Sequence, residues 1–240
     1  FHGQMYIMGA LLRHGSETQK ADWLPRIANG ALRLQAFSVT EPEAGSDTTR
    51  IRTFARREGN NYVINGHKNW TSRIEQSDLM LLLARTTPLE EVETRTNGLS
   101  LFLVDLREAR KQNGALRVKP VNTMMNYETY QVTYEKMIVP AENLIGEAGQ
   151  GFRYIIDGWN AERILLAAEC IGDGYWFIDT ASAYAKNREV FGIPIGKNQG
   201  VQFPLARVYA DLSAADLIRY KAAWLFDRGE RCGAEANMAK

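Results

Sequence analysis

The spacing of hydrophobic residues changes twice along the chain and divides it into three parts. In residues 6–13 apolar side chains recur at helical spacing, and His14-Gly15 would end that helix. A second helix is expected to begin after Ser16, with Gln19 in the reciprocal capping position, and to stop at Asn29-Gly30. We interpret these two helices as the end of a helical domain.

Between residue 34 and about residue 140 the pattern is that of short strands. Residues 51–57 alternate between apolar and polar, and Gly59-Asn60-Asn61 predicts a hairpin turn. Residues 79–84 and 99–104 are nearly continuous apolar runs, typical of strands covered on both faces. Further strands are expected at residues 62–64, 118–121, 130–134 and 137–139. Many short strands with turns between them predict an antiparallel barrel or sandwich.

Helical spacing returns after the glycine-rich residues 147–151. These glycines could form a phosphate loop, but no Lys-Ser or Lys-Thr follows them, so a linker is favoured. One long helix is expected over residues 152–178, although Gly172 and Gly174 weaken the pattern, and another over residues 198–228. The predicted domains are residues 1–36, 37–146 and 147–240.

Composition narrows the class of protein. The 240 residues are 45% apolar and 24% charged with a net charge of +1, which is ordinary for a globular protein and gives no reason to expect nucleic acid as a partner. No apolar run is long enough to span a bilayer, and no signal peptide is visible. Cys170 and Cys232 form no metal pattern and suit a reducing compartment, so we expect the cytoplasm, or the mitochondrial matrix in a eukaryote. The chain does not begin with Met and ends inside a helical pattern, so we expect part of a longer protein.

Three short segments carry residues suited to binding a cofactor. Phe37 to Asp47 begins as a strand and ends in a Gly-Ser turn, where Gly45 would let a ligand approach the backbone. Taken alone, this segment could also be an ordinary surface loop. The other two segments are Asn65-Gly66-His67-Lys68-Asn69-Trp70-Thr71-Ser72 and Arg188-Glu189-Val190-Phe191-Gly192 with Asn198-Gln199.

These three segments resemble the three flavin-binding blocks of the acyl-CoA dehydrogenase family, in the family's order. The first resembles the block Thr-Glu-Pro-x-Ala-Gly-Ser-Asp, the second Asn-Gly-x-Lys-x-Trp, and the third Arg-x-x-Phe-Gly followed by Gln. The resemblance covers essentially the whole chain. It implies an α+β multidomain fold: N-terminal helices, a central antiparallel β-barrel or sandwich domain that binds FAD and acyl-CoA, and an incomplete C-terminal four-helix bundle.

By resemblance, Thr40 and the backbone of Val39 would contact the flavin edge, and Trp70 would stack near the ring. Trp70 could alternatively be a core residue, and Arg188 a surface arginine near a helix end. The implied FAD-binding residues are Phe37, Val39, Thr40, Gly45, Ser46, Trp70, Thr71, Ser72, Arg188, Phe191, Asn198 and Gln199, the last four reaching the flavin of a neighbouring subunit. The implied substrate-binding residues are Ser46, Asn160 and Arg163, with Arg163 near the CoA portion.

The implied reaction is FAD-dependent α,β-dehydrogenation of an acyl-CoA thioester to the trans-2-enoyl-CoA, in which a carboxylate removes the α-proton. Electrons would pass to an electron-transfer flavoprotein, and the protein would be a homodimer or homotetramer. In most of the family the basic glutamate would lie beyond Lys240, and in a minority it matches Glu162, which could equally be a helix-surface or pocket-rim carboxylate.

Two departures from the family pattern put the substrate in doubt. Asn126 to Tyr130 replaces a small Ser/Thr-rich loop, and Arg73 stands where many members carry Asn-Gly. Two other functions stay open on the sequence: an acyl-CoA oxidase or flavin-dependent monooxygenase on the same fold, and a non-catalytic subunit that binds flavin or acyl-CoA.

Overall fold

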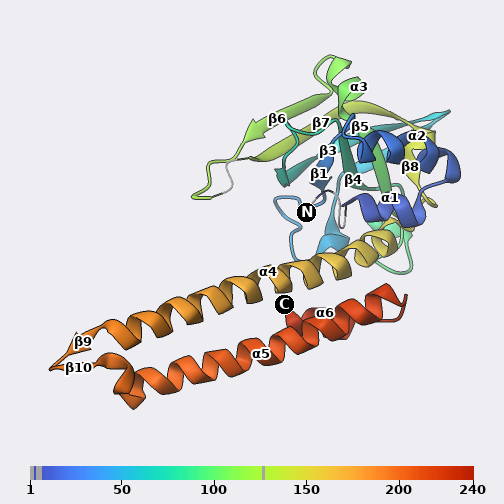
Figure 1. Cartoon of the computed structure of the whole chain (residues 1–240). Coiled ribbons are helices and arrows are strands. Elements are labelled where there is room, and N and C mark those ends of the chain that lie inside the picture. The colour runs from blue at the N-terminus through green and yellow to red at the C-terminus, as the bar shows by residue number, and fades with distance from the viewer. Residues whose placement is uncertain (1–2, 4–6, 126–127) are drawn as a thin grey trace. The chain divides into compact units, whose positions relative to one another are not determined.

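The structure is a computed structural model that describes residue 3, residues 7–125 and residues 128–240. Contacts divide the chain into two compact units, one reaching to Gly158 and the other spanning Trp159–Lys240 (Figure 1). The first unit holds a sheet and short helices, and the second holds long helices. The predicted domain limits at residues 36/37 and 146/147 stay predictions.

The first unit opens with the two predicted helices. These are α1 (Met8–His14) and α2 (Glu17–Ala28), and α2 begins with the predicted capping box, because Ser16 and Gln19 bond reciprocally. Gln19 Nε2 also donates to the carbonyl oxygens of Glu142 and Leu144, at 2.6 and 2.9 Å. These bonds hold α2 against the end of the sheet.

One eight-stranded sheet fills the rest of the first unit. Its order is β6-β7-β3-β2-β4-β5-β8, and β1 also pairs with β4. The strands are β1 (Leu34–Ser38), β2 (Phe54–Glu58), β3 (Asn61–Ser72), β4 (Leu79–Arg85), β5 (Leu99–Asp105), β6 (Leu116–Pro120), β7 (Thr129–Pro140) and β8 (Leu144–Ile145), with the short helix α3 (Leu106–Lys111) after β5.

The sheet is mostly antiparallel, but β4 pairs in parallel with both β1 and β2. The hairpin predicted at Gly59-Asn60-Asn61 joins β2 to β3, and every residue of β4 is buried, as its continuous apolar run predicts. The strands expected at residues 130–134 and 137–139 are one strand, β7, which passes through Lys136 at a φ of 52°. Period-two patterns therefore located the strands but not the parallel pairings.

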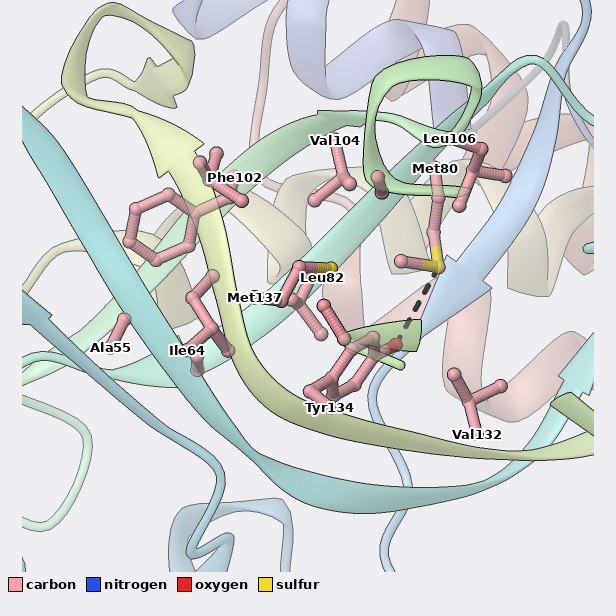
Figure 2. Close-up of a cluster of buried hydrophobic side chains, with 14 of the residues drawn as sticks. Ala55, Ile64, Met80, Leu82, Phe102, Val104, Leu106, Val132, Tyr134 and Met137 are labelled. Carbon is pink, nitrogen blue, oxygen red and sulfur yellow. Dashed lines mark hydrogen bonds between the residues drawn. The ribbon is translucent and has the colours of Figure 1, made fainter. Parts of the chain in front are cut away.

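The core of the first unit lies against this sheet. Figure 2 shows side chains of β2, β3, β4, β5, β7 and α3 meeting there, with Tyr134 pointing its hydroxyl at the sulfur of Met80, 3.6 Å away. The labelled residues are Ala55, Ile64, Met80, Leu82, Phe102, Val104, Leu106, Val132, Tyr134 and Met137. Tyr134 links this layer to the ends of β1 and β3, because its hydroxyl lies 2.8 Å from that of Ser38, which bonds Thr71.

The second unit contains most of α4 (Gly151–Asn187), then the hairpin β9 (Glu189–Val190) and β10 (Ile193–Pro194), α5 (Gln199–Asp227) and α6 (Gly233–Ala239) (Figure 1). Helix α4 continues through Gly172 and Gly174. A Cβ on Gly174 would lie 2.5 Å from Leu212 Cδ2, so the glycine lets α5 pack closely there. In the described part of the chain, no helix is long and apolar enough to cross a membrane.

Candidate functional site

The first predicted segment leaves β1 and folds back on itself. Ser38 ends the strand, and the next turn is closed by two hydrogen bonds between the backbones of Glu41 and Ala44, both 3.1 Å. Phe37, Val39 and Thr40 are half-buried, whereas Gly45 and Ser46 are exposed. The turn therefore presents a short stretch of backbone and small side chains at the edge of the first unit.

Hydrogen bonds join the first predicted segment to the second. Asn69 N donates to Thr40 O at 2.8 Å, and Lys68 Nζ donates to Val39 O at 2.7 Å. Beside these bonds, the hydroxyls of Ser38, which precedes Val39, and Thr71, two residues after Asn69, lie 3.0 Å apart. The structure thus brings Val39, Thr40 and the end of β3 together, as the sequence predicts.

The hydroxyls of the second segment are already engaged by the protein. Thr71 is fully buried, and its bond to Ser38 continues to Tyr134 Oη, 2.8 Å from Ser38 Oγ. Burial raises the pKa of the Tyr134 phenol above its usual value, so the three hydroxyl groups of this hydrogen-bonded row stay uncharged at neutral pH. Ser72 Oγ donates to Thr129 Oγ1 at 3.3 Å. The predicted Thr71 contact to a cofactor would therefore have to come from its backbone.

Trp70 is set apart from its neighbours by its backbone. The β3–β7 register shifts between Lys68 and Thr71, and Trp70 has a φ of 61°. Such bulges redirect a side chain, and positive φ at a bulky residue is strained. Trp70 is 54% exposed, so the alternative that it is a core tryptophan is wrong. Strain of this kind collects at functional sites.

A buried ion pair that was not expected from the sequence supports both segments. Lys68 is completely buried, and its Nζ lies 3.0 Å from Glu41 Oε1. Glu41 also accepts backbone hydrogen bonds from Arg52 N at 2.6 Å and Thr53 N at 2.9 Å. A signal was available, because Lys68 has the same parity in β3 as buried Tyr62 and Ile64.

Burial controls the ionisation of this pair. It lowers the pKa of Lys68 to about 8, although the Glu41 carboxylate acts in the opposite direction. Burial alone would raise the pKa of Glu41, but the Lys68 ammonium and the N–H groups of Arg52 and Thr53 outweigh it, and the pKa is lowered. Both groups are therefore charged at neutral pH.

Gly66 of the second segment has a packing role. A Cβ at this position would lie 2.6 Å from Thr53 Cα, which is backbone and cannot move aside. The glycine therefore lets β3 lie against the chain at Thr53, whose N–H binds Glu41. Gly66 of the motif thus supports the backbone beside the ion pair, whereas Asn65 Oδ1 accepts a hydrogen bond from Lys136 N at 2.9 Å.

The third predicted segment lies in the second unit and is exposed. Phe191 and Gly192 form the tip of the β9–β10 hairpin at φ values of 54° and 76°, and the Phe191 side chain is 100% exposed. Arg188 and Gln199 are exposed. Asn198 caps α5, because its side chain accepts a hydrogen bond from Gly200 N at 3.0 Å.

Two predicted substrate residues, Asn160 and Arg163, and the candidate base Glu162 lie on α4 within the second unit, whereas the third, Ser46, belongs to the first unit. Arg163 Nη1 lies 3.5 Å from Asn160 Oδ1, and its guanidinium lies 5.9 Å from the Trp159 ring centroid. Glu162 Oε1 is 3.8 Å from Lys240 Nζ. Of the loop at Asn126 to Tyr130, residues 126 and 127 lie outside the described part of the chain. Among the described residues, no cluster of three or more His, Cys, Asp or Glu could hold a metal.

Comparison with known proteins identifies the family. The family model "Acyl-CoA dehydrogenase, middle domain" matches residues 36–137, and "Acyl-CoA dehydrogenase, C-terminal domain" matches residues 149–240. Acyl-CoA dehydrogenase fadE12 of Mycobacterium bovis is 35% identical over 232 residues, which are 96% of this chain and 58% of that protein. The chain thus spans a little over half the length of this relative.

Solved structures agree in fold. An acyl-CoA dehydrogenase from Geobacillus kaustophilus superposes with a TM-score of 0.88 at 27% identity, covering 100% of this chain and 61% of that one. A structure described as PigA with FAD and proline has a TM-score of 0.86 at 27% identity, covering 96% and 58%. One described as the electron transferring flavoprotein of Acidaminococcus fermentans has a TM-score of 0.83 at 31% identity, covering 96% and 59%. Family models over both units and these related folds show that this chain belongs to the acyl-CoA dehydrogenase family.

Proposed function

We propose that this chain carries the flavin and acyl-thioester sites of an FAD-dependent acyl-CoA dehydrogenase. The observation that carries the proposal is the hydrogen-bonded junction between residues 39–40 and 68–71, beside a strained, exposed indole. FAD would accept a hydride from the β-carbon of the acyl group.

The residues at this junction fit a flavin. In the described part of the chain, neither the N–H nor the hydroxyl of Thr40 makes a hydrogen bond, so both are available as donors. Donors beside the ring stabilise the electron density that reduction adds. The indole of Trp70 offers a flat face 54% open to solvent. Thr40 would therefore orient the ring edge and Trp70 would cover the ring.

In a homo-oligomer, the second unit of a neighbouring subunit would supply further contacts to FAD. The guanidinium of Arg188 suits the diphosphate of FAD, because its fork makes paired charge-assisted bonds. Phe191 at the tip of the β9–β10 hairpin and Asn198 and Gln199 at the start of α5 would contribute to the same flavin. Arg163 on α4 would lie near the CoA portion of the substrate, and Asn160 and Ser46 would also contact the substrate. In this proposal the protein is a homodimer or homotetramer, and its electrons pass to an electron-transfer flavoprotein.

Glu162 is a weaker candidate for the base. Its carboxylate pairs with Lys240 at 3.8 Å, which supports a structural role rather than proton abstraction. If Glu162→Gln retains proton abstraction, as we expect, a group other than Glu162 is the base. Loss of abstraction with flavin binding intact would instead assign the base to Glu162.

Anaerobic titration of the purified protein with FAD and then butyryl-CoA tests the proposal. We expect bound flavin to lose its visible absorbance only slowly on adding the thioester, because the chain alone should have low activity, and to recover slowly in air. Rapid peroxide formation would instead indicate an oxidase, and failure to bind FAD would refute the flavin site. Thr40→Ala should slow flavin reduction by about tenfold or more, because one donor to the ring is lost. Thr94→Ala, an exposed turn threonine, should not.

A further inference from the structure

The buried pair Lys68–Glu41 bears on the proposed flavin site, although the Lys68 side chain has no exposed area and that of Glu41 is only 8% exposed. We propose that Lys68, held by Glu41, is a positioning residue that turns the Thr40 N–H outward for the cofactor. This inference rests on the proposed function. Lys68 and Glu41 would then contribute to cofactor binding as well as to the stability of the fold.

Lys68 holds the backbone carbonyl of Val39. Lys68 Nζ donates to Val39 O at 2.7 Å from a side chain with no exposed area. A charged donor in a dry environment binds a carbonyl more strongly than a neutral one. The Val39 carbonyl is therefore fixed toward the interior of the first unit.

The geometry of the peptide bond then sets the direction of the Thr40 N–H. The Val39–Thr40 peptide is planar and trans, as no cis peptide occurs among the described residues, so its C=O and N–H point in opposite directions. Since the carbonyl points at Lys68, the Thr40 N–H points away from Lys68. That N–H has no hydrogen-bond partner within the part of the chain described. Thr40 O is held separately by Asn69 N at 2.8 Å.

Glu41 in turn holds Lys68 in place. Glu41 Oε1 lies 3.0 Å from Lys68 Nζ, and the carboxylate is fixed by the N–H groups of Arg52 and Thr53. Glu41 is in turn anchored by its backbone bonds to Ala44. The ammonium therefore has little freedom to choose another acceptor. A neutral or shorter side chain at position 68 would leave the Val39–Thr40 peptide free to rotate.

Arg85 provides a matched control. It is also a buried cation, 3% exposed, and it also donates to backbone carbonyls, those of Ile51, Thr87 and Asn97 among them. None of these carbonyls belongs to the Val39–Thr40 peptide. Losing Arg85 should destabilise the first unit without turning the Thr40 N–H.

The test compares Lys68→Met with Arg85→Met in the purified protein. Fluorescence titration gives the Kd for FAD, the visible spectrum reports on the ring's surroundings, and denaturant unfolding of the apo-protein gives stability. Both variants should lose stability. Only Lys68→Met should also weaken FAD binding, by about tenfold for one lost hydrogen bond to the ligand, and shift the bound flavin's absorbance maximum.

The outcomes separate the two proposals. If wild-type protein binds no FAD, the proposed function fails. If wild type binds FAD and Lys68→Met matches Arg85→Met in Kd and spectrum, the positioning role fails while the proposed function stands. Should Lys68→Met not fold, Glu41→Gln replaces it: retained affinity with an unshifted spectrum then refutes the role, and a weakened, shifted flavin supports it.

Discussion

The parts of the proposed flavin site in the two units differ in how their side chains are held. In the first unit, Lys68, Glu41 and Thr71 are buried and hydrogen-bonded to the chain itself. In the second, Arg188 and Phe191 are exposed, and the described apolar side chains of Trp176 and Tyr209 are more than half exposed. A buried site residue therefore affects folding and binding together, whereas an exposed one can be changed with little effect on folding.

This difference gives each region its own measurement. Stability reports on the first unit, because an uncompensated charge or an unsatisfied hydroxyl in its interior is costly. The affinity for FAD is the better measurement for the second unit, because surface substitutions there usually change stability little. A buried residue of the first unit whose loss also weakens FAD binding is therefore the most informative about function.

Breaking the buried ion pair should have the largest effect. Lys68→Met leaves the Glu41 carboxylate buried without its partner, so we expect a loss of about 3–5 kcal/mol in the free energy of unfolding. The double variant Lys68→Met/Glu41→Gln should lose less than the sum of its single variants, because it leaves no charge behind. Denaturant unfolding measures all three.

The control is Lys119→Met, at an exposed lysine of β6, which should stay within about 0.5 kcal/mol of wild type. Additive losses in the double variant would contradict a coupled buried pair. The two segments would then be held together chiefly by their backbone bonds.

The missed ion pair shows what sequence reasoning could and could not reach. Strands and helices followed from periodicity, because burial of one face imposes a period on the residues. The second segment's Lys68 was seen as part of a motif, yet nothing in the local pattern says which carboxylate lies beside it. That pairing joins residues 27 positions apart and depends on how β1 and β3 are placed in the sheet.

For the candidate site, the sequence located the segments but not the contacts between them. Three motifs located the segments, and the structure joins the first two through Thr40 and Asn69. The strain at Trp70 was not predictable, because a bulge depends on register with β7 rather than on residue type. Nor did the sequence show that the Thr71 hydroxyl is occupied by Ser38, a contact between two strand ends.

Acid should weaken the first unit through Glu41, with an intermediate effect. The pKa of this carboxyl is lowered from its usual 4.5 in the folded state. Its stabilising contribution is therefore complete above pH 4.5 and is lost as the pH falls through the lower folded pKa. We expect the Tm difference between wild type and Glu41→Gln to shrink as the pH is lowered from 7 toward about 3.

Glu43→Gln is the matched control, because the Glu43 side chain is 79% exposed and its only described ion pair, with Arg52, spans 3.6 Å. Its Tm difference from wild type should be small, because an exposed ion pair contributes little to stability. A difference for Glu41→Gln that stays constant down to pH 3 would show that the carboxyl is not stabilised in its charged form.

The smallest effect is expected at the hairpin tip of the second unit, and it should be a gain in stability. Phe191 has a φ of 54° and a side chain that is 100% exposed, so it bears left-handed strain without burial in return. Asn tolerates this conformation, and Phe191→Asn should raise the free energy of unfolding by about 0.5–1 kcal/mol, as measured in denaturant. Ile193→Asn, at an exposed neighbour with ordinary φ, should give no such gain. If Phe191→Asn gains stability but binds FAD more weakly, the strained phenylalanine is retained for the ligand. A loss of stability would instead contradict the strain assigned to Phe191.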